Sequence, residues 1–73
     1  METVRFGLIG YGHCGAQRAA AVARTAGAQL VGVATPSAER QGAARAAHPQ
    51  AFVCADYREL LDRTDVDIVC VSV

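Results

Sequence analysis

The sequence contains no lysine and no tryptophan, and it carries no surplus of charge of either sign. All seven of its basic residues are arginines, and they balance seven acidic residues. Because there is no run or excess of positive charge, nothing indicates a nucleic-acid partner or binding to an acidic membrane surface. The missing lysine also excludes a P-loop, whose G-K-[ST] motif places a lysine at the phosphates.

Cysteines are few, and long apolar runs are absent. The three cysteines, Cys14, Cys54 and Cys70, are widely spaced and form no C-x-x-C pair. This pattern favours neither a disulfide framework nor a zinc site, and reduced thiols are typical of the cytoplasm. No secretory signal or membrane-spanning segment is recognisable, so we expect a cytoplasmic protein with no membrane partner. A chain of 73 residues forms at most one small domain.

Three aspartates, Asp62, Asp65 and Asp67, stand close together in the sequence. A metal site is one interpretation of this spacing. However, alternation in the apolar segment that follows puts Asp65 and Asp67 at the entrance of a strand. We therefore interpret all three as solvated or capping charges and predict no metal ligands.

The most informative stretch is G-Y-G-H-C-G at residues 10–15, between an apolar run and an alanine-rich segment. Strand, glycine loop and helix form the context in which a G-x-G-x-x-G pattern indicates dinucleotide binding. Gly10 permits the tight turn, Gly12 lets a diphosphate approach the backbone, and Gly15 allows the helix to pack closely on the strand. The first N–H groups of the helix lack intrahelical partners, and the helix dipole favours an anion there.

Two alternatives to this hypothesis concern the same loop. A glycine turn that serves only for packing could have the same sequence, so this alternative stays open. A methyltransferase loop is excluded, because it would usually carry an acidic residue where Ile9 stands. His13 and Cys14 belong to the loop and are predicted to line the binding site. A thiol at a helix N-terminus can be reactive, but it more often fills the space between loop and helix. We interpret His13 as a solvent-side residue and assign no catalytic role to either side chain.

Periodicity and turn residues predict seven alternating elements. Gly27 is predicted to cap the first helix, and an Asp56–Glu59 pair resembles a capping box for the third. On the first helix, alanines 16, 19, 20, 23 and 26 are expected to face the sheet. The predicted strands are residues 4–9, 29–34, 51–54 and 66–73, and the predicted helices are residues 14–26, 38–47 and 56–63.

This order predicts an α/β fold in which a parallel sheet of about four strands, in the order 3-2-1-4, has helices on both faces. It corresponds to the first half of a doubly wound sheet, a partial Rossmann fold. A fourth strand this apolar would ordinarily be flanked by a fifth. We therefore expect residues 1–73 to be the N-terminal part of a dinucleotide-binding domain, with the remainder of that domain beyond them.

The residues after the second strand bear on the choice of cofactor. NAD-binding folds usually place an acid there to bond the ribose hydroxyls, but this chain has Thr35. An uncharged residue does not repel a 2′-phosphate, and Ser37 and Arg40 are able to bind one. NADP is therefore slightly favoured over NAD. Alternatively, Thr35 and Ser37 only shape the turn and cap the helix, while Arg40 is solvated.

The whole chain resembles the N-terminal segment of the glucose–fructose oxidoreductase, inositol 2-dehydrogenase and MocA family. The resemblance lies in R-F-G-L-I-G-Y-G-H-C-G at residues 5–15, A-Q-L-V-G-V-A at 28–34 and the pair Glu39-Arg40. Its most distinctive part is D-Y-R-E-L-L-D at 56–62 followed by D-V-D-I-V-C-V-S-V at 65–73. The sequence departs from the family pattern at Thr35, where most members have Asp, and at Arg18, where a histidine is common.

The resemblance implies an NAD(P)-dependent oxidoreductase that moves hydride between nicotinamide and a hydroxyl-bearing carbon of a sugar, polyol or similar small molecule. The full-length protein would be a homo-oligomer. The resemblance places the family's catalytic motifs and its C-terminal substrate domain beyond residue 73, so no catalytic residue is assigned and the segment alone is expected to be inactive. A non-enzymatic NAD(P)-binding sensor module, or a truncated gene product, are the alternative interpretations.

Overall fold

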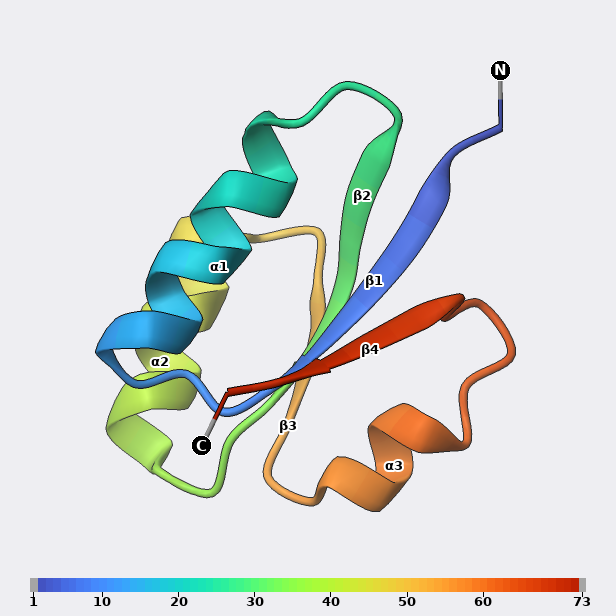
Figure 1. Cartoon of the computed structure of the whole chain (residues 1–73). Helices are drawn as coiled ribbons and strands as arrows, with labels where there is room; N and C mark the ends of the chain where they lie inside the picture. Colours follow the sequence, from blue (N-terminus) through green and yellow to red (C-terminus); the bar gives the residue numbers. More distant parts are fainter. Residues whose placement is uncertain (1, 73) are drawn as a thin grey trace.

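Within residues 2–72, four strands and three helices alternate, as the sequence predicts (Figure 1). The computed structural model describes residues 2–72. The strands are all parallel and lie in the order β3-β2-β1-β4, which confirms the predicted sheet. The elements are β1 (Val4–Ile9), α1 (His13–Arg24), β2 (Ala28–Ala34), α2 (Ala38–Ala47), β3 (Phe52–Cys54), α3 (Tyr57–Leu61) and β4 (Ile68–Val71).

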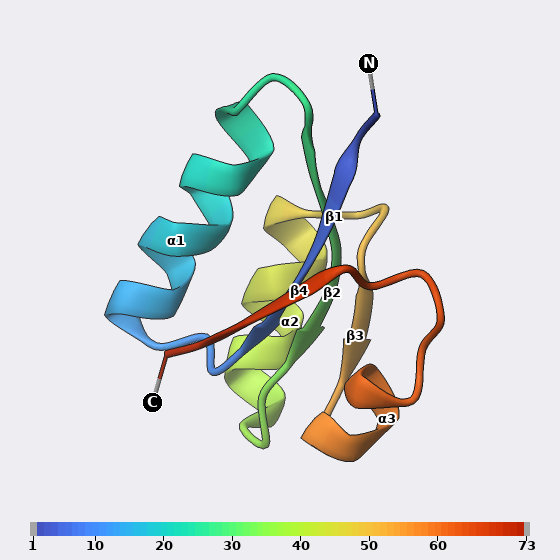
Figure 2. The same cartoon turned by 45° about the vertical axis from the view of Figure 1, so that its right-hand side comes forward.

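Helices cover both faces of the sheet. The helices α1 and α2 lie side by side on one face, and α3 lies on the other (Figures 1 and 2). The chain therefore changes sides between β3 and β4, and β4 pairs with β1 rather than extending the sheet beyond β3. This reversal makes the gap between β1 and β4 the topological switch point, where open α/β sheets bind ligands at the carboxyl ends of their strands.

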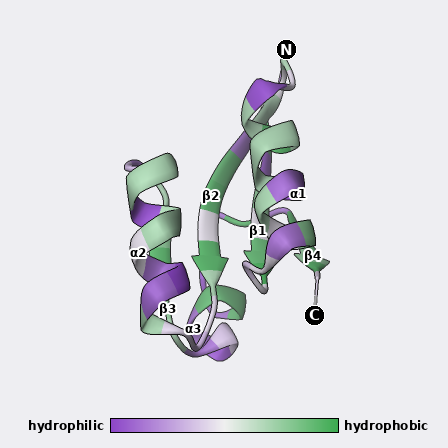
Figure 3. Cartoon of the chain, turned by 90° about the vertical axis from the view of Figure 1, so that its left-hand side faces the viewer, coloured by the Kyte–Doolittle hydropathy of each residue, from purple (hydrophilic) through white to green (hydrophobic). Residues whose placement is uncertain are grey.

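Alternation along the strands produces two apolar layers. Leu8 and Val33 point toward α1 and α2, whereas their neighbours Ile9 and Ala34 point toward α3. Leu60 of α3 is fully buried in the second layer. In Figure 3 hydrophobic residues make up most of the strands, and hydrophilic residues are interspersed with hydrophobic ones along α1 and α2. The buried residues of the first layer are Leu8, Tyr11, Ala19, Leu30, Val33 and Ala44; those of the second are Ala34, Cys54 and Leu60.

The first helix differs from the prediction in its ends and in the face it buries. It begins at His13 and ends at Arg24, with Thr25 as its C-terminal cap. Gly27 lies beyond the cap, in a turn closed by the Ala28 N–H bond to the Thr25 carbonyl, and its φ of 82° suits a glycine there. The predicted inner face is correct in part: Ala16 and Ala19 pack in the apolar layer and Ala20 is half-buried. Ala23 and Ala26 are exposed, while Gly15, Ala19 and the half-buried Val22 face the sheet.

β1 and α2 have the predicted bounds, and the remaining elements depart from theirs by one or two residues at their ends. β2 begins one residue earlier than predicted, and β3 one residue later. α3 ends at Leu61, and Asp56 caps it by accepting the Arg58 N–H at 2.9 Å rather than that of Glu59, so the capping box is not formed. β4 is shorter than predicted because Val66 packs on Leu60 instead of joining the ladder. The predicted end of this strand, residue 73, lies outside the described residues.

Among residues 2–72, no helix has the length and apolar character needed to cross a membrane. The same part of the chain contains no group of three or more acidic, histidine or cysteine side chains arranged to hold a metal ion.

Candidate functional site: a glycine loop at the carboxyl edge of the sheet

The glycine loop connects β1 to α1 at the switch point of the sheet. Gly10 has a φ of 96°, a conformation that favours glycine, and its N–H bonds the Ala34 carbonyl at 2.8 Å. A Cβ on Gly15 would overlap the carbonyl oxygen of Gly10, so only glycine lets the first turn of α1 lie so close to the loop. These two positions have the roles that the sequence predicts for them.

The N-terminus of α1 is open. Its N-cap is Gly12, which has no side chain to accept a hydrogen bond, and no acidic residue lies in the first turn. In contrast, Ser37 caps α2 and Asp56 caps α3, and each of those helices carries a glutamate in its first turn. The N–H groups at the start of α1 are thus left to an external acceptor, and the helix dipole favours a negatively charged one.

The two side chains inside the loop point outward. His13 and Cys14 are both exposed in the first turn of α1, and Nε2 of His13 lies 3.2 Å from the Gln17 side-chain nitrogen. Cys14 therefore does not fill the space between loop and helix. The buried side chain of the loop is Tyr11, which is 8% exposed, shares an apolar layer with Ala19 of α1 and Ala44 of α2, and meets the His48 ring edge-on with a centroid separation of 6.3 Å. Sequence reasoning missed Tyr11, because the glycine pattern leaves this position unspecified.

The segment after β2 lies beside the loop, and its three predicted site residues differ in exposure. Thr35 is only 1% exposed; its N–H bonds the Cys54 carbonyl at 2.9 Å, and its carbonyl accepts from the Gln41 side chain at 3.0 Å. Ser37 is half-buried, and its hydroxyl accepts the Arg40 N–H at 3.3 Å. Arg40 is exposed. The structure thus brings this segment and the loop together at one edge, with an uncharged, buried residue where an acid is usual.

An apolar hollow of about 440 Å³ opens at the same edge, on the α3 side of the loop. Sequence reasoning did not identify it, although Tyr57, the first residue of α3, lies two residues beyond Ala55 at the carboxyl end of β3 and is 51% exposed. A flat ring system could lie here against apolar side chains. The hollow is lined by Ile9, Gly10, Ala34, Pro36, Ala55, Asp56 and Tyr57.

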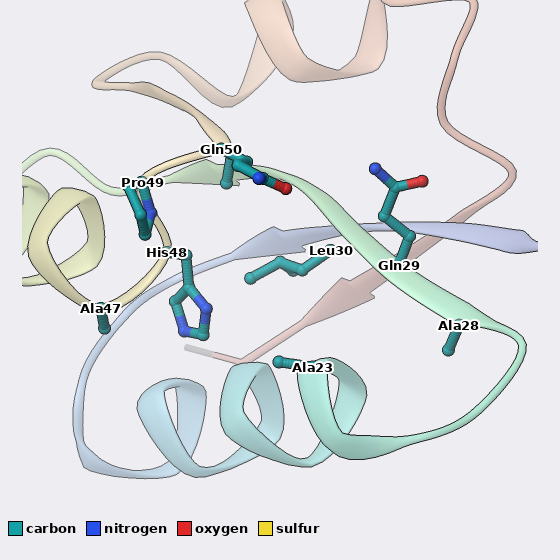
Figure 4. A pocket seen from close by; sticks show the side chains of 9 residues that line it. Ala23, Ala28, Gln29, Leu30, Ala47, His48, Pro49 and Gln50 are labelled. Carbon is teal, nitrogen blue, oxygen red and sulfur yellow. The ribbon is translucent and has the colours of Figure 1, made fainter.

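A second hollow, of about 290 Å³, lies at the opposite edge between the C-terminal halves of α1 and α2 (Figure 4). His48 and Leu30 point into it, with Ala23 on the far wall (Figure 4). No arginine or carboxylate lines this hollow, and the amino ends of the strands surround it. It therefore does not suit a diphosphate.

Two of the three aspartates considered as possible metal ligands are held in ion pairs, and the third, Asp62, is the exposed C-terminal cap residue of α3. Arg5 bonds Asp67 through its N–H at 2.8 Å and through its guanidinium at 3.1 and 3.2 Å, and these bonds hold the pKa of Asp67 below its usual value. Arg63 likewise pairs with Asp65 at 2.8 Å and lowers the pKa of that carboxyl. Both side chains therefore form structural ion pairs, whereas the sequence predicted solvated or capping charges.

A parallel sheet with this order, a G-x-G-x-x-G loop at its switch point and an open helix N-terminus together define the dinucleotide-binding half of a Rossmann fold. The sequence profile of the oxidoreductase family with an NAD-binding Rossmann fold matches residues 4–73. The chain belongs to this family, which takes its name from glucose–fructose oxidoreductase, inositol dehydrogenase and MocA.

Solved structures of similar proteins agree with this assignment. A myo-inositol dehydrogenase from Corynebacterium glutamicum shares 32% identity over 97% of this chain and 21% of its own, with a TM-score of 0.85. The WlbA dehydrogenase from Bordetella pertussis, in complex with NADH and UDP-GlcNAcA, shares 26% identity over 99% of this chain and 22% of its own, with a TM-score of 0.87. A similar fold occurs in a scyllo-inositol dehydrogenase from Lactobacillus casei with bound NAD(H) and scyllo-inositol. It shares 20% identity over 99% of this chain and 22% of its own, with a TM-score of 0.87. No significant match is found among curated protein sequences. The chain spans about a fifth of the length of each of these structures.

Proposed function

We propose that the glycine loop of this chain binds the diphosphate of a nicotinamide dinucleotide. The observation that carries the proposal is the open N-terminus of α1, where Gly12 provides no cap and no acidic side chain competes for the N–H groups. Gly10 and Gly15 give the loop its turn and its close packing, while the exposed His13 and Cys14 border the site. A diphosphate would accept the free N–H groups and face the positive end of the helix dipole.

The adenosine half of the cofactor would lie beyond β2. The apolar hollow beside Pro36 and Tyr57 suits the adenine ring, and the ribose would then lie at the end of β2. Thr35 forms the floor there, with Ser37 at the rim. Because Thr35 carries no charge, nothing at this position repels a 2′-phosphate, and NADP is slightly favoured over NAD.

The proposed activity of the whole protein is hydride transfer between the nicotinamide and a hydroxyl of a sugar, polyol or similar molecule. It is supported by membership of an oxidoreductase family and by the similarity to a myo-inositol dehydrogenase over nearly the entire chain. Residues 1–73 would then form the N-terminal part of the cofactor domain and supply cofactor binding rather than the reacting groups.

The test is calorimetric titration of the full-length gene product with NADH and NADPH. Binding of at least one of the two is expected. Thr35→Asp should lower the affinity for NADPH far more than that for NADH, because the added carboxylate repels the 2′-phosphate of NADPH but accepts hydrogen bonds from the ribose hydroxyls of NADH. Thr35→Asn is the matched uncharged control. No binding of either nucleotide would refute the proposed function, and equal effects of Thr35→Asp on both would remove residue 35 from the ribose site.

A further inference from the structure

The side chain of Arg40 lies over the glycine loop rather than at the end of β2. The three heavy atoms nearest to a Cβ built on Gly12 all belong to the Arg40 guanidinium: one Nη at 3.7 Å, Cζ at 3.8 Å and the other Nη at 3.9 Å. Gly12 is also the residue at which α1 begins. The guanidinium thus adjoins the first turn of α1, where the proposed function places a diphosphate.

Local structure explains how Arg40 reaches this position. It is the third residue of α2, and side chains on a helix lean toward the N-terminus of their own helix. The Ser37 hydroxyl accepts its backbone N–H, and the neighbouring Gln41 bonds the Thr35 carbonyl at the end of β2. These two bonds fix the start of α2 beside the glycine loop, so the side chain extends across the gap to Gly12.

The charge of Arg40 is not neutralised by the part of the chain that the structure describes. The three ion pairs within residues 2–72 engage Arg5, Arg58 and Arg63. Arg40 instead presents a planar set of N–H donors beside the positive end of the α1 dipole. Two sources of positive potential therefore meet at Gly12.

We propose that Arg40 is a binding residue for the diphosphate of the cofactor and does not select for the 2′-phosphate. This inference rests on the proposed function and replaces the expectation that Arg40 binds at the adenosine end. NADH and NADPH share the diphosphate, so Arg40 supports both equally. The choice between them is left to Thr35 and Ser37, at the end of β2.

The experiment measures binding of NADH, NADPH, ADP-ribose and 2′-AMP to the full-length protein and to Arg40→Gln. Because Arg40→Gln removes a charge-assisted hydrogen bond, we expect it to lower the affinities for NADH, NADPH and ADP-ribose alike, by about ten- to a hundredfold. The affinity for 2′-AMP, which has the 2′-phosphate but no diphosphate, should stay unchanged. Arg45→Gln is the matched control, since Arg45 is exposed on the same helix but in its last turn.

Three outcomes would overturn the inference. If Arg40→Gln bound NADPH and 2′-AMP more weakly but NADH as before, Arg40 would lie at the 2′-phosphate. If its affinity for all four ligands were unchanged, Arg40 would be a solvated side chain without contact to the cofactor. Equal losses of cofactor affinity in Arg40→Gln and Arg45→Gln would mean that Arg40 acts only through the overall charge of the protein. The backbone bond of residue 40 to Ser37 survives either substitution, so thermal unfolding of Arg40→Gln should match that of Arg45→Gln. If the unsubstituted protein bound neither NADH nor NADPH, the proposed function itself would fail.

Discussion

Replacing Gly12 with aspartate should stabilise the fold while abolishing cofactor binding. Gly12 has φ −78° and ψ −162°, an extended conformation that aspartate adopts at a helix N-cap. Its carboxylate would accept the free N–H groups of the first turn and face the helix dipole, contributing about 0.5–1 kcal/mol to the free energy of unfolding. The nearest atoms to the new Cβ belong to the flexible end of Arg40, so nothing rigid is displaced.

The same carboxylate would occupy the place of the diphosphate and repel it. Two charge-assisted bonds at about 1.5 kcal/mol each correspond to a loss of affinity of more than about a hundredfold. The assays are chemical unfolding of the full-length protein and titration with NADH and ADP-ribose. Stability and affinity are thus expected to change in opposite directions, which a merely structural glycine would not produce.

Gly15→Ala is the contrasting variant. Its Cβ would overlap the carbonyl oxygen of Gly10, a backbone atom that cannot move without distorting the loop. The free energy of unfolding and the affinity for NADH should therefore fall together. If Gly12→Asp instead lowered stability and left NADH binding intact, the loop would be a packing turn and the anion-site reasoning would be wrong.

Two further predictions concern the scaffold. Leu60→Ala, which empties the fully buried centre of the α3 layer, should lower the free energy of unfolding by about 2–5 kcal/mol, measured by denaturant titration; a loss below about 1 kcal/mol would show that α3 is loosely packed. Asp67→Asn should lower the melting temperature at neutral pH. Because Arg5 holds the pKa of Asp67 low, the carboxylate stabilises the fold above its unfolded pKa of about 3.9, and that contribution is lost as pH falls through the folded value. The variant should therefore lose less stability than the unsubstituted protein between about pH 5 and pH 2, and identical acid profiles would contradict this role.

The parts of the fold that follow from local rules were predictable from the sequence. Alternating apolar segments, glycine spacing and the Ser37 cap depend on residues close together in the chain, and together they indicate the β3-β2-β1-β4 sheet and the loop at its edge. The bounds of β4 depend instead on distant partners. Val66 reads as a strand residue, yet it packs on Leu60, and Asp67 is held by Arg5 sixty-two positions away.

The candidate site was predictable to the same extent. The turn at Gly10 and the close packing at Gly15 depend on a short backbone segment, so the glycine spacing identifies them. The position of Arg40 over Gly12 depends on how α2 docks against β2, which no local pattern specifies. The burial of Thr35 and the apolar hollow at Tyr57 likewise arise only when β2 and β3 lie side by side.

The placement of charges at the two ends of β1 explains why binding is expected at one end only. At the amino end, Arg5 and Asp67 satisfy each other, so the start of β4 is fixed to β1 and offers no free charge to a ligand. At the carboxyl end, the strands are joined by a backbone bond from Ser72 to Ile9, and the nearby guanidinium of Arg40 has no carboxylate partner within residues 2–72. This difference supports the proposal that an anion binds at the glycine loop, on the side of the sheet reversal between β1 and β4.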